Sequence, residues 1–236
     1  MPLMQHLADA DRPGSFSNRL RSRRFRLFER LTGPMRASME RPLRIVDLGG
    51  TAGFWEHRGW AGRSDIEITT VNHEADRINT AGHANIRAIR GDVTDLDHLA
   101  DDSFDVAFSN SVIEHLYTPD RQAMMAAQMR RLAPAFWLQT PNYWFPMEPH
   151  FHVVGWQWMP IAVRKTVIKH RRCGWRGPCR DVASADATVR EVRLMTRGQL
   201  RRLFPDAVIM PERFGGLVKS WIIHAGFPPV HETDES

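Results

Sequence analysis

The sequence predicts an α/β fold with a doubly wound, mostly parallel sheet. An apolar segment at 44–48 runs into a glycine-rich turn, which is typical of the first strand of such a sheet. β-rich segments follow at 66–71, 85–90 and 103–108, and apolar residues at helical spacing follow at 120–132. This alternation of strands and helices favours a parallel sheet.

The end of the first strand is where a ligand is expected. The glycines at positions 49, 50 and 53 allow a sharp turn and let the backbone approach a bound molecule closely. A dinucleotide fingerprint needs the pattern G-x-G-x-x-G, but position 51 is Thr. The turn therefore indicates a nucleotide-like ligand and weakens the case for NAD.

The same segment resembles motif I of class I S-adenosylmethionine-dependent methyltransferases, an acid followed by L-G-C-G-x-G. Asp47, Gly49 and Gly53 match this motif, whereas Gly50 takes the cysteine position and Thr51 replaces the middle glycine. The resemblance implies that S-adenosylmethionine is the cofactor. It also implies that Asp47, Gly49, Gly50 and Gly53 help to bind it.

Two further segments match the family in its order. The family places an acid at the end of the second strand to accept the ribose hydroxyls; that position holds Asn72, and Glu74 lies two residues on. We expect Glu74 to bind the ribose, with Asn72 as the competitor and a solvated Glu74 as the other interpretation. The segment 91–96 resembles the family's G-D-x-x-D-L and implies that Asp92 and the adjoining Val93 meet the adenine edge.

The segment 103–116 is the most specific match. It reads S-F-D-V-A-F-S-N-S-V-I-E-H-L, close to the family's S-F-D-x-V-x-x-x-x-x-L-E-H-L. Asn110 and Ser111 follow the strand and are expected to lie against the cofactor, because ligands of open α/β sheets bind beyond the carboxyl ends of the strands. The family fold implied is a Rossmann-like, seven-stranded sheet with a terminal antiparallel hairpin, expected at 207–210 and 218–224.

Two places offer a base for methyl transfer, which is an in-line displacement that needs alignment and, for a hydroxyl acceptor, proton removal. His115 follows the fourth strand, and its alternative role is helix packing. The proline-rich loop 141–152 carries Glu148 and His150 and resembles a bacterial branch of the methyltransferase 11 group. His150 is the first candidate for the base, although an ion pair of Glu148 with His150 that holds the loop shut is the alternative.

No metal site is predicted. Some quinone-ring methyltransferases of the family carry a further Glu three residues before the Glu-His pair and hold a divalent metal ion, but that position is Ser111 here. Cys173 and Cys179 are too few for a structural zinc site, even with His170 nearby. We expect both to be free thiols.

The chain is expected to form one domain over 1–236, with an N-terminal helical extension at 1–40 and an inserted cap over the acceptor site at 141–190. The formal net charge is +5, and basic residues concentrate at 19–26 and 164–180. Such patches suit an acidic substrate, an anionic membrane or RNA, although solvated helix faces are the commoner explanation.

The N-terminal segment 17–31 is roughly amphipathic, which fits a helix packed on the domain or one that contacts a membrane peripherally. The sequence shows no secretory signal and no apolar run long enough to span a bilayer. We therefore expect a cytoplasmic protein.

The combined pattern predicts an S-adenosylmethionine-dependent methyltransferase that acts on a small-molecule, glycan or lipid-linked acceptor, most simply at oxygen. One alternative is an RNA methyltransferase, but the residues from Asn110 lack an N-P-P-Y type loop, so a nucleic-acid partner is not expected. The other is a cofactor-binding subunit that has lost catalysis, suggested by Thr51 and Asn72.

Overall fold

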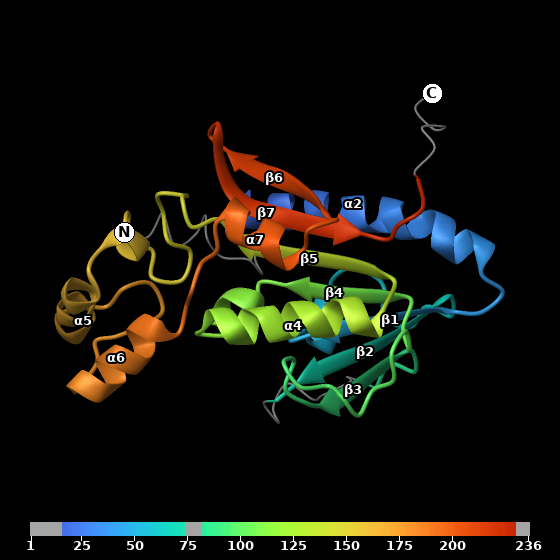
Figure 1. The fold of residues 1–236 in the computed structure, drawn as a ribbon, viewed down its shortest axis with the longest axis horizontal. Helices are drawn as coiled ribbons and strands as arrows, with labels where there is room; N and C mark the ends of the chain where they lie inside the picture. The colour runs from blue at the N-terminus through green and yellow to red at the C-terminus, as the bar shows by residue number, and fades with distance from the viewer. Residues whose placement is uncertain (1–15, 74–81, 230–236) are drawn as a thin grey trace.

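The computed structural model describes residues 16–73 and 82–229, and a seven-stranded sheet lies at its centre (Figure 1). The strand order is β3-β2-β1-β4-β5-β7-β6. β1 to β5 pair in parallel, and β7 runs antiparallel to both β5 and β6. The strands are β1 (Leu43–Leu48), β2 (Ile66–Asn72), β3 (Ile86–Arg90), β4 (Val106–Asn110), β5 (Ala135–Pro141), β6 (Val208–Phe214) and β7 (Leu217–Ala225). The predicted fold class and its terminal hairpin are confirmed.

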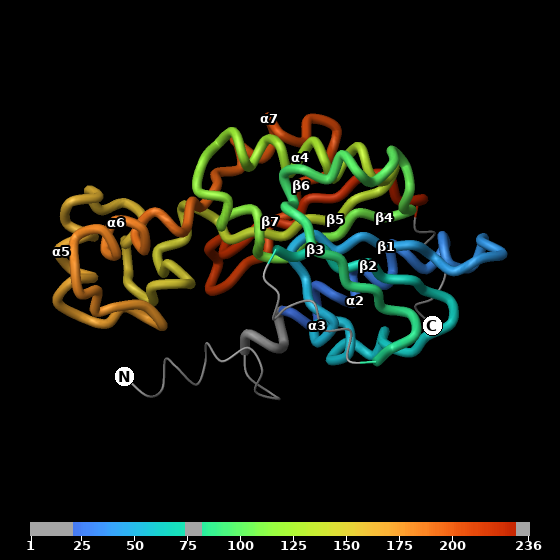
Figure 2. The backbone as a smooth tube through the Cα atoms, turned by 90° about the horizontal axis from the view of Figure 1, so that it is seen from below, coloured from blue at the N-terminus to red at the C-terminus, as the bar shows by residue number. Residues whose placement is uncertain are grey.

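Helices cover both faces of this sheet. On one face lie α4 (Pro119–Leu132) and α7 (Arg197–Leu203), whose Met125, Met129 and Leu200 are buried against the sheet. On the other face lie α2 (Phe16–Ser38) and the short α3 (Ala52–Glu56) (Figures 1 and 2). Thr118 caps α4 by accepting a hydrogen bond from the Arg121 amide, and a proline at the first helical position favours the same start.

The described part of the N-terminal extension expected at 1–40, helix α2, packs on the domain, and residues 1–15 lie outside the described residues. Phe25, Phe28, Leu31 and Met35 of α2 are buried in the same core as β1. Burial of each such side chain stabilises the fold by about 1.5–3 kcal/mol. The apolar face that the sequence also offered to a membrane is therefore occupied by the protein itself over this part of the helix.

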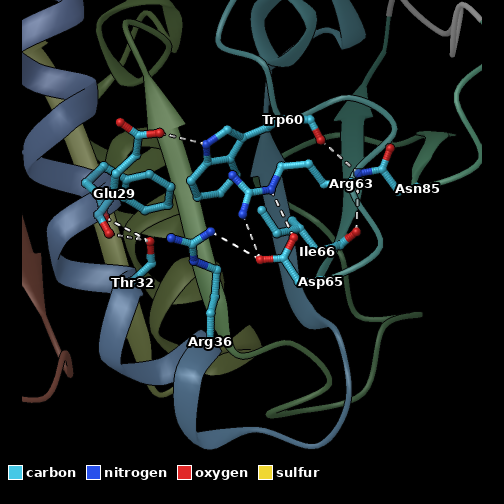
Figure 3. A network of polar contacts seen from close by, with 9 residues as sticks. Glu29, Thr32, Arg36, Trp60, Arg63, Asp65, Ile66 and Asn85 are labelled. Atoms are coloured by element: carbon cyan, nitrogen blue, oxygen red, sulfur yellow. Dashed lines mark hydrogen bonds and ion pairs between the residues drawn. The ribbon is translucent and has the colours of Figure 1, made fainter.

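Polar contacts fix the C-terminal half of α2 to the turn before β2 (Figure 3). Trp60 Nε1 donates to Glu29 at 3.0 Å, and Arg36 donates to Asp65 at 3.2 Å. Asp65 also accepts two hydrogen bonds from Arg63. These contacts set the position of α2 along the sheet.

The segment expected to be a cap forms a lobe beside the sheet (Figure 2). It contains η3 (Trp156–Trp158), α5 (Ile161–His170) and α6 (Val182–Arg190). The lobe has a small core of its own, made of Phe151, Trp156, Ile168, Cys173, Ala185 and Val189. Both cysteines are free thiols. Since β5 leads into this lobe, the lobe joins the sheet at the end where the parallel strands finish.

No helix within the described ranges is long and apolar enough to cross a membrane.

Candidate functional site

A cavity of about 680 Å³ lies at the carboxyl ends of β1, β2 and β4. Its wall includes side chains from the cap lobe as well as from the sheet. Most of the residues predicted to bind the cofactor line it: Asp47, Gly49, Gly50, Asn72, Asp92, Val93, Asn110 and Ser111. Gly53 is not among the lining residues, and Glu74 falls outside the described residues.

The turn after β1 needs two of its glycines. Gly49 has φ +82°, and its amide donates to the Val71 carbonyl at 2.8 Å. A Cβ at position 49 would lie 2.6 Å from Val112, and one at position 50 would lie 1.7 Å from a carboxylate oxygen of Asp47. A Cβ on Gly53 would meet no atom within 4 Å. Close packing thus explains why positions 49 and 50 are glycine, but it does not explain the glycine at position 53.

Asp47 presents a buried carboxylate beside this turn. Trp55 Nε1 donates to Oδ2 at 2.8 Å, while Oδ1 has no hydrogen-bond partner among the described residues. Burial raises the pKa of Asp47 to about 7, and the hydrogen bond from Trp55 opposes that rise only in part. An unpaired buried oxygen at the wall of a cavity is suited to a cationic or hydrogen-bonding group of a ligand.

Asn72 holds the glycine turn. Its Nδ2 donates to the carbonyl oxygens of Gly49 and Gly50, at 3.3 and 3.4 Å. The amide therefore links the end of β2 to the end of β1. Ribose binding by Asn72 or Glu74 stays a prediction. His73, which sequence reasoning did not select, also lines the cavity.

Asp92 is held by an arginine from α4. Its carboxylate accepts from the Thr94 amide and hydroxyl and from Arg121, whose Nη2 lies 2.8 Å from Oδ2. Burial favours a higher pKa for Asp92, but the hydrogen bonds from Arg121 and Thr94 outweigh it and lower the pKa. Arg121 lines the cavity as well, and no sequence motif indicated it.

Asn110 and Ser111 are connected to the N-terminal helix through Arg24. Arg24 Nη1 donates at 2.7 Å to Asn110 Oδ1 and, also at 2.7 Å, to Gln139 Oε1. Gln139 Oε1 accepts a second hydrogen bond from the Ser111 hydroxyl at 2.8 Å. Ser111 has φ +58°, an uncommon backbone conformation for a non-glycine residue, and its amide donates to the Gln139 carbonyl.

The three predicted catalytic residues lie together at the cap side of the cavity. Glu148 is buried and accepts from His150 Nδ1 at 2.8 Å, from the His150 amide at 2.7 Å and from the Phe151 amide at 2.6 Å. The ring of His150 stands edge-on to that of His115, with the centroids 4.7 Å apart. Both imidazoles line the cavity, whereas Glu148 lies behind them.

The two histidines differ in their electrostatic environment. Burial favours a lower pKa for His150, but the hydrogen bond and the negative charge of Glu148 outweigh it and raise the pKa. Burial and the neighbouring His150 lower the pKa of His115 to about 4. His115 is therefore neutral near pH 7, whereas His150 readily accepts a proton.

Glu114, one residue before His115, is a fully buried carboxylate. Its Oε2 accepts from the Thr140 hydroxyl at 2.9 Å, and its Oε1 has no hydrogen-bond partner among the described residues. Burial raises the pKa of Glu114. One ligand-type atom from each of Glu114, His115 and His150 lies within 4.8 Å of the other two. The expectation of no metal rested on Ser111 at the third ligand position and on too few cysteines, and it did not foresee that His150 would reach the Glu-His pair.

Comparison with known proteins identifies the fold. Residues 47–137 match a family model described as a methyltransferase domain. Uncharacterized proteins from two strains of Mycobacterium tuberculosis are 28% identical over an alignment of 148 positions, and the alignment covers 55% of this chain and 48% of theirs. The chain thus spans about half the length of the curated relatives it matches.

Two solved structures share the architecture at low identity. One is phosphoethanolamine N-methyltransferase 2 of Haemonchus contortus in complex with S-adenosyl-L-methionine, with a TM-score of 0.52 and 13% identity over 79% of this chain and 37% of that one. The other is a possible exported protein from Bordetella parapertussis, with a TM-score of 0.55 and 14% identity over 94% of this chain and 78% of that one. These similarities concern the fold.

The matched residues 47–137 contain the glycine turn, the Asn72 contact, Asp92 and the Glu-His pair. The sheet order and the cavity at the strand ends agree with that match. The match over residues 47–137 therefore supports a class I S-adenosylmethionine-dependent methyltransferase domain, in agreement with the sequence motifs.

Proposed function

We propose that this protein transfers a methyl group from S-adenosylmethionine to a hydroxyl oxygen of a small-molecule, glycan or lipid-linked acceptor. The observation that carries the proposal is the pairing of His150 with the buried Glu148 at the wall of the same cavity that the glycine turn lines. This pair provides a proton acceptor on the part of the cavity wall that the cap lobe supplies.

The cofactor is assigned to the glycine turn. Gly49 and Gly50 give it room, and the unpaired Oδ1 of Asp47 suits the ammonium group of its methionine moiety. We assign the adenine to Asp92 and Val93. The ribose is assigned to Glu74, with Asn72 as the alternative; the contacts of Asn72 with the turn favour a positioning role for it.

The chemistry then requires alignment and one proton acceptor. The cofactor, when bound, supplies an electrophilic methyl carbon on a sulfonium. The acceptor oxygen would form the new bond to that carbon, and the carbon–sulfur bond would break with its electron pair left on sulfur. His150 Nε2 takes the hydroxyl proton, because Glu148 holds Nδ1 and stabilises the resulting imidazolium. His115, neutral near pH 7, packs against this ring.

Two cations of the basic segment 164–180 are paired within the lobe. Arg176 pairs with Glu191 through its Nε at 2.8 Å, and Lys165 pairs with Asp186 at 2.7 Å. Cations that are neutralised within the lobe contribute little to binding the phosphates of RNA.

The alternative of a subunit without catalysis predicts cofactor binding with no turnover.

The test is transfer of isotopically labelled methyl from S-adenosylmethionine to a panel of phenols, glycans and lipid-linked sugars. The proposal expects labelled product with at least one class of hydroxyl acceptor and loss of that label in the His150→Gln variant. Labelling of amines but of no hydroxyl compound would contradict the oxygen assignment. Cofactor binding without labelling of any compound would favour the non-catalytic subunit.

A further inference from the structure

We propose that Glu114, His115 and His150 form a binding site for one divalent transition-metal ion, of which zinc is the best probe. Their ligand-type atoms all lie within 4.8 Å of one another. Two imidazoles and one carboxylate, with a further coordination position open, make up a common catalytic zinc set. Two of the ligands precede α4 as η2 (Ile113–His115), and the third comes from the cap lobe.

Two of the ligands are held by a second hydrogen-bond partner that leaves one atom for the ion. His150 Nδ1 is bound to Glu148, which leaves Nε2. For His115, the Glu191 backbone acts on the ring and opposes the effect of burial on its pKa. Glu114 Oε2 is bound to the Thr140 hydroxyl, which leaves Oε1. Metal-ligating histidines in proteins usually donate their other nitrogen to a carboxylate or a carbonyl in this way.

The unpaired oxygen of Glu114 is the independent indication that something binds here. The side chain has no exposed surface, yet Oε1 has no hydrogen-bond partner among the described residues. Burying a carboxylate without a partner is costly, and a coordinated cation removes that cost. The carboxylates around the cluster are Glu114, Glu148 and Glu191, and the cation beside them is Arg176. Glu148 is paired with His150 and Glu191 with Arg176, so Glu114 is the carboxylate that a divalent cation would neutralise.

The geometry requires a small contraction. Zinc holds nitrogen and oxygen ligands at about 2.0–2.2 Å, so tetrahedral ligands lie about 3.4 Å apart. Since His150 belongs to the lobe and Glu114 to η2, a small shift of the loop toward the sheet brings the three atoms together. His115 and His150 both line the cavity, so the open coordination position faces the space assigned to the acceptor.

Metal binding itself does not depend on the proposed function; only its use in catalysis rests on it. An ion at this position would bind the acceptor oxygen and lower the pKa of the hydroxyl. Coordination and proton acceptance are alternative uses of His150 Nε2, and the metal content of active protein decides between them.

The experiment uses the full chain with its affinity tag removed. The protein is freed of metal by dialysis, titrated with zinc in competition with a chromophoric chelator, and analysed for zinc content by mass spectrometry. The variants are Glu114→Gln, His150→Ala and Glu148→Gln, and the matched controls are Glu67→Gln and His98→Ala, whose side chains are exposed. Every sample is also titrated with S-adenosylhomocysteine.

We expect about one zinc per chain in the wild type and in both controls, with little bound to Glu114→Gln or His150→Ala. Glu148→Gln should weaken zinc binding by about 10–100-fold, the usual effect of removing a partner of a ligating histidine. If a ligand variant does not fold, the wild type is loaded with cobalt instead. Its visible absorption and the paramagnetically shifted signals of histidine protons then show whether two imidazoles are coordinated.

Fewer than about 0.1 zinc per chain in the wild type, or equal binding by the ligand variants and the controls, would overturn the metal site. A cobalt form without shifted histidine signals would do the same. These outcomes are separate from failure of the proposed function, which would appear as absent S-adenosylhomocysteine binding in the same samples.

Discussion

Arg24 in α2 and Glu212 in β6 form a two-point ion pair that joins the N-terminal helix to the last hairpin. Arg24 Nε lies 3.2 Å from Oε1 and Nη2 lies 2.7 Å from Oε2, although 188 positions separate the residues. Their side chains are only 10% and 9% exposed. The remaining nitrogen of the guanidinium reaches Asn110 and Gln139. One side chain therefore connects α2 to the strand ends at the cavity.

Replacing Arg24 with Ala should destabilise the fold by about 3 kcal/mol, because it leaves the largely buried Glu212 without its partner. The measurement is denaturant unfolding, with Arg26→Ala as the exposed control, expected within about 0.5 kcal/mol of wild type. The double variant with Glu212→Ala should cost clearly less than the sum of the two single changes. Additive losses would show that the two groups do not interact.

The glycine turn provides a matched pair of substitutions. Gly50→Ala places a Cβ 1.7 Å from Asp47, so the turn or the carboxylate must move and cofactor affinity should fall by at least about tenfold. Gly53→Ala meets no atom within 4 Å and lies inside α3, so it should leave affinity unchanged and raise stability by about 0.4–1 kcal/mol. The measurements are calorimetric titration with S-adenosylhomocysteine and thermal unfolding.

Equal affinity of the two glycine variants would contradict the assignment of the cofactor to this turn. Loss of affinity in Gly53→Ala alone would instead move the cofactor contact to the start of α3.

Asp47 should make stability depend on pH. Burial raises its pKa to about 7, against about 3.9 for an unfolded aspartate. Between pH of about 4 and about 7, the folded state therefore keeps a proton on Asp47 that the unfolded state has lost. Stability contributed by this group therefore falls as pH rises from about 4 to about 7, by up to about 4 kcal/mol. The difference between wild type and Asp47→Asn in denaturant unfolding across this range isolates the effect. Parallel pH profiles of the two proteins would contradict the raised pKa of Asp47.

The histidine cluster should separate catalysis from cofactor binding. His150→Gln should lower turnover by about two to four orders of magnitude, because the proposed role of His150 is to accept the proton of the acceptor hydroxyl. The affinity for S-adenosylmethionine should change little, because His150 is not assigned to cofactor binding. His152→Ala is the matched control in the same loop and should change turnover less than about threefold. A large loss from His115→Ala with a mild effect from His150→Gln would pass the base assignment to His115.

The sheet and the residues at the carboxyl end of β1 that line the cavity followed from the sequence because they depend on local pattern. The hairpin expected at 207–210 and 218–224 is β6 and β7, longer by several residues. Asp47 and the glycines line the cavity because a strand that ends in a turn fixes their position wherever the rest of the chain lies. Gly53 matched the motif but does not line the cavity.

The contacts that complete the site could not be predicted in the same way. Arg24 reaches Asn110 across 86 positions, and its basic segment reads as a solvated helix face until the fold places it. The approach of His150 to the Glu-His pair depends on the path of an aperiodic lobe. For this reason Ser111 was the position weighed as a third metal ligand from the sequence, and His150 of the cap was not foreseen there.

Calorimetric titration of the wild-type protein measures whether the cavity beside Gly49 and Gly50 binds S-adenosylmethionine. We predict saturable binding of S-adenosylmethionine or S-adenosylhomocysteine at one site per chain, with a dissociation constant on the order of micromolar and a matching rise in melting temperature. No heat and no thermal stabilisation with either ligand at about 1 mM, together with both effects from NAD, would contradict it.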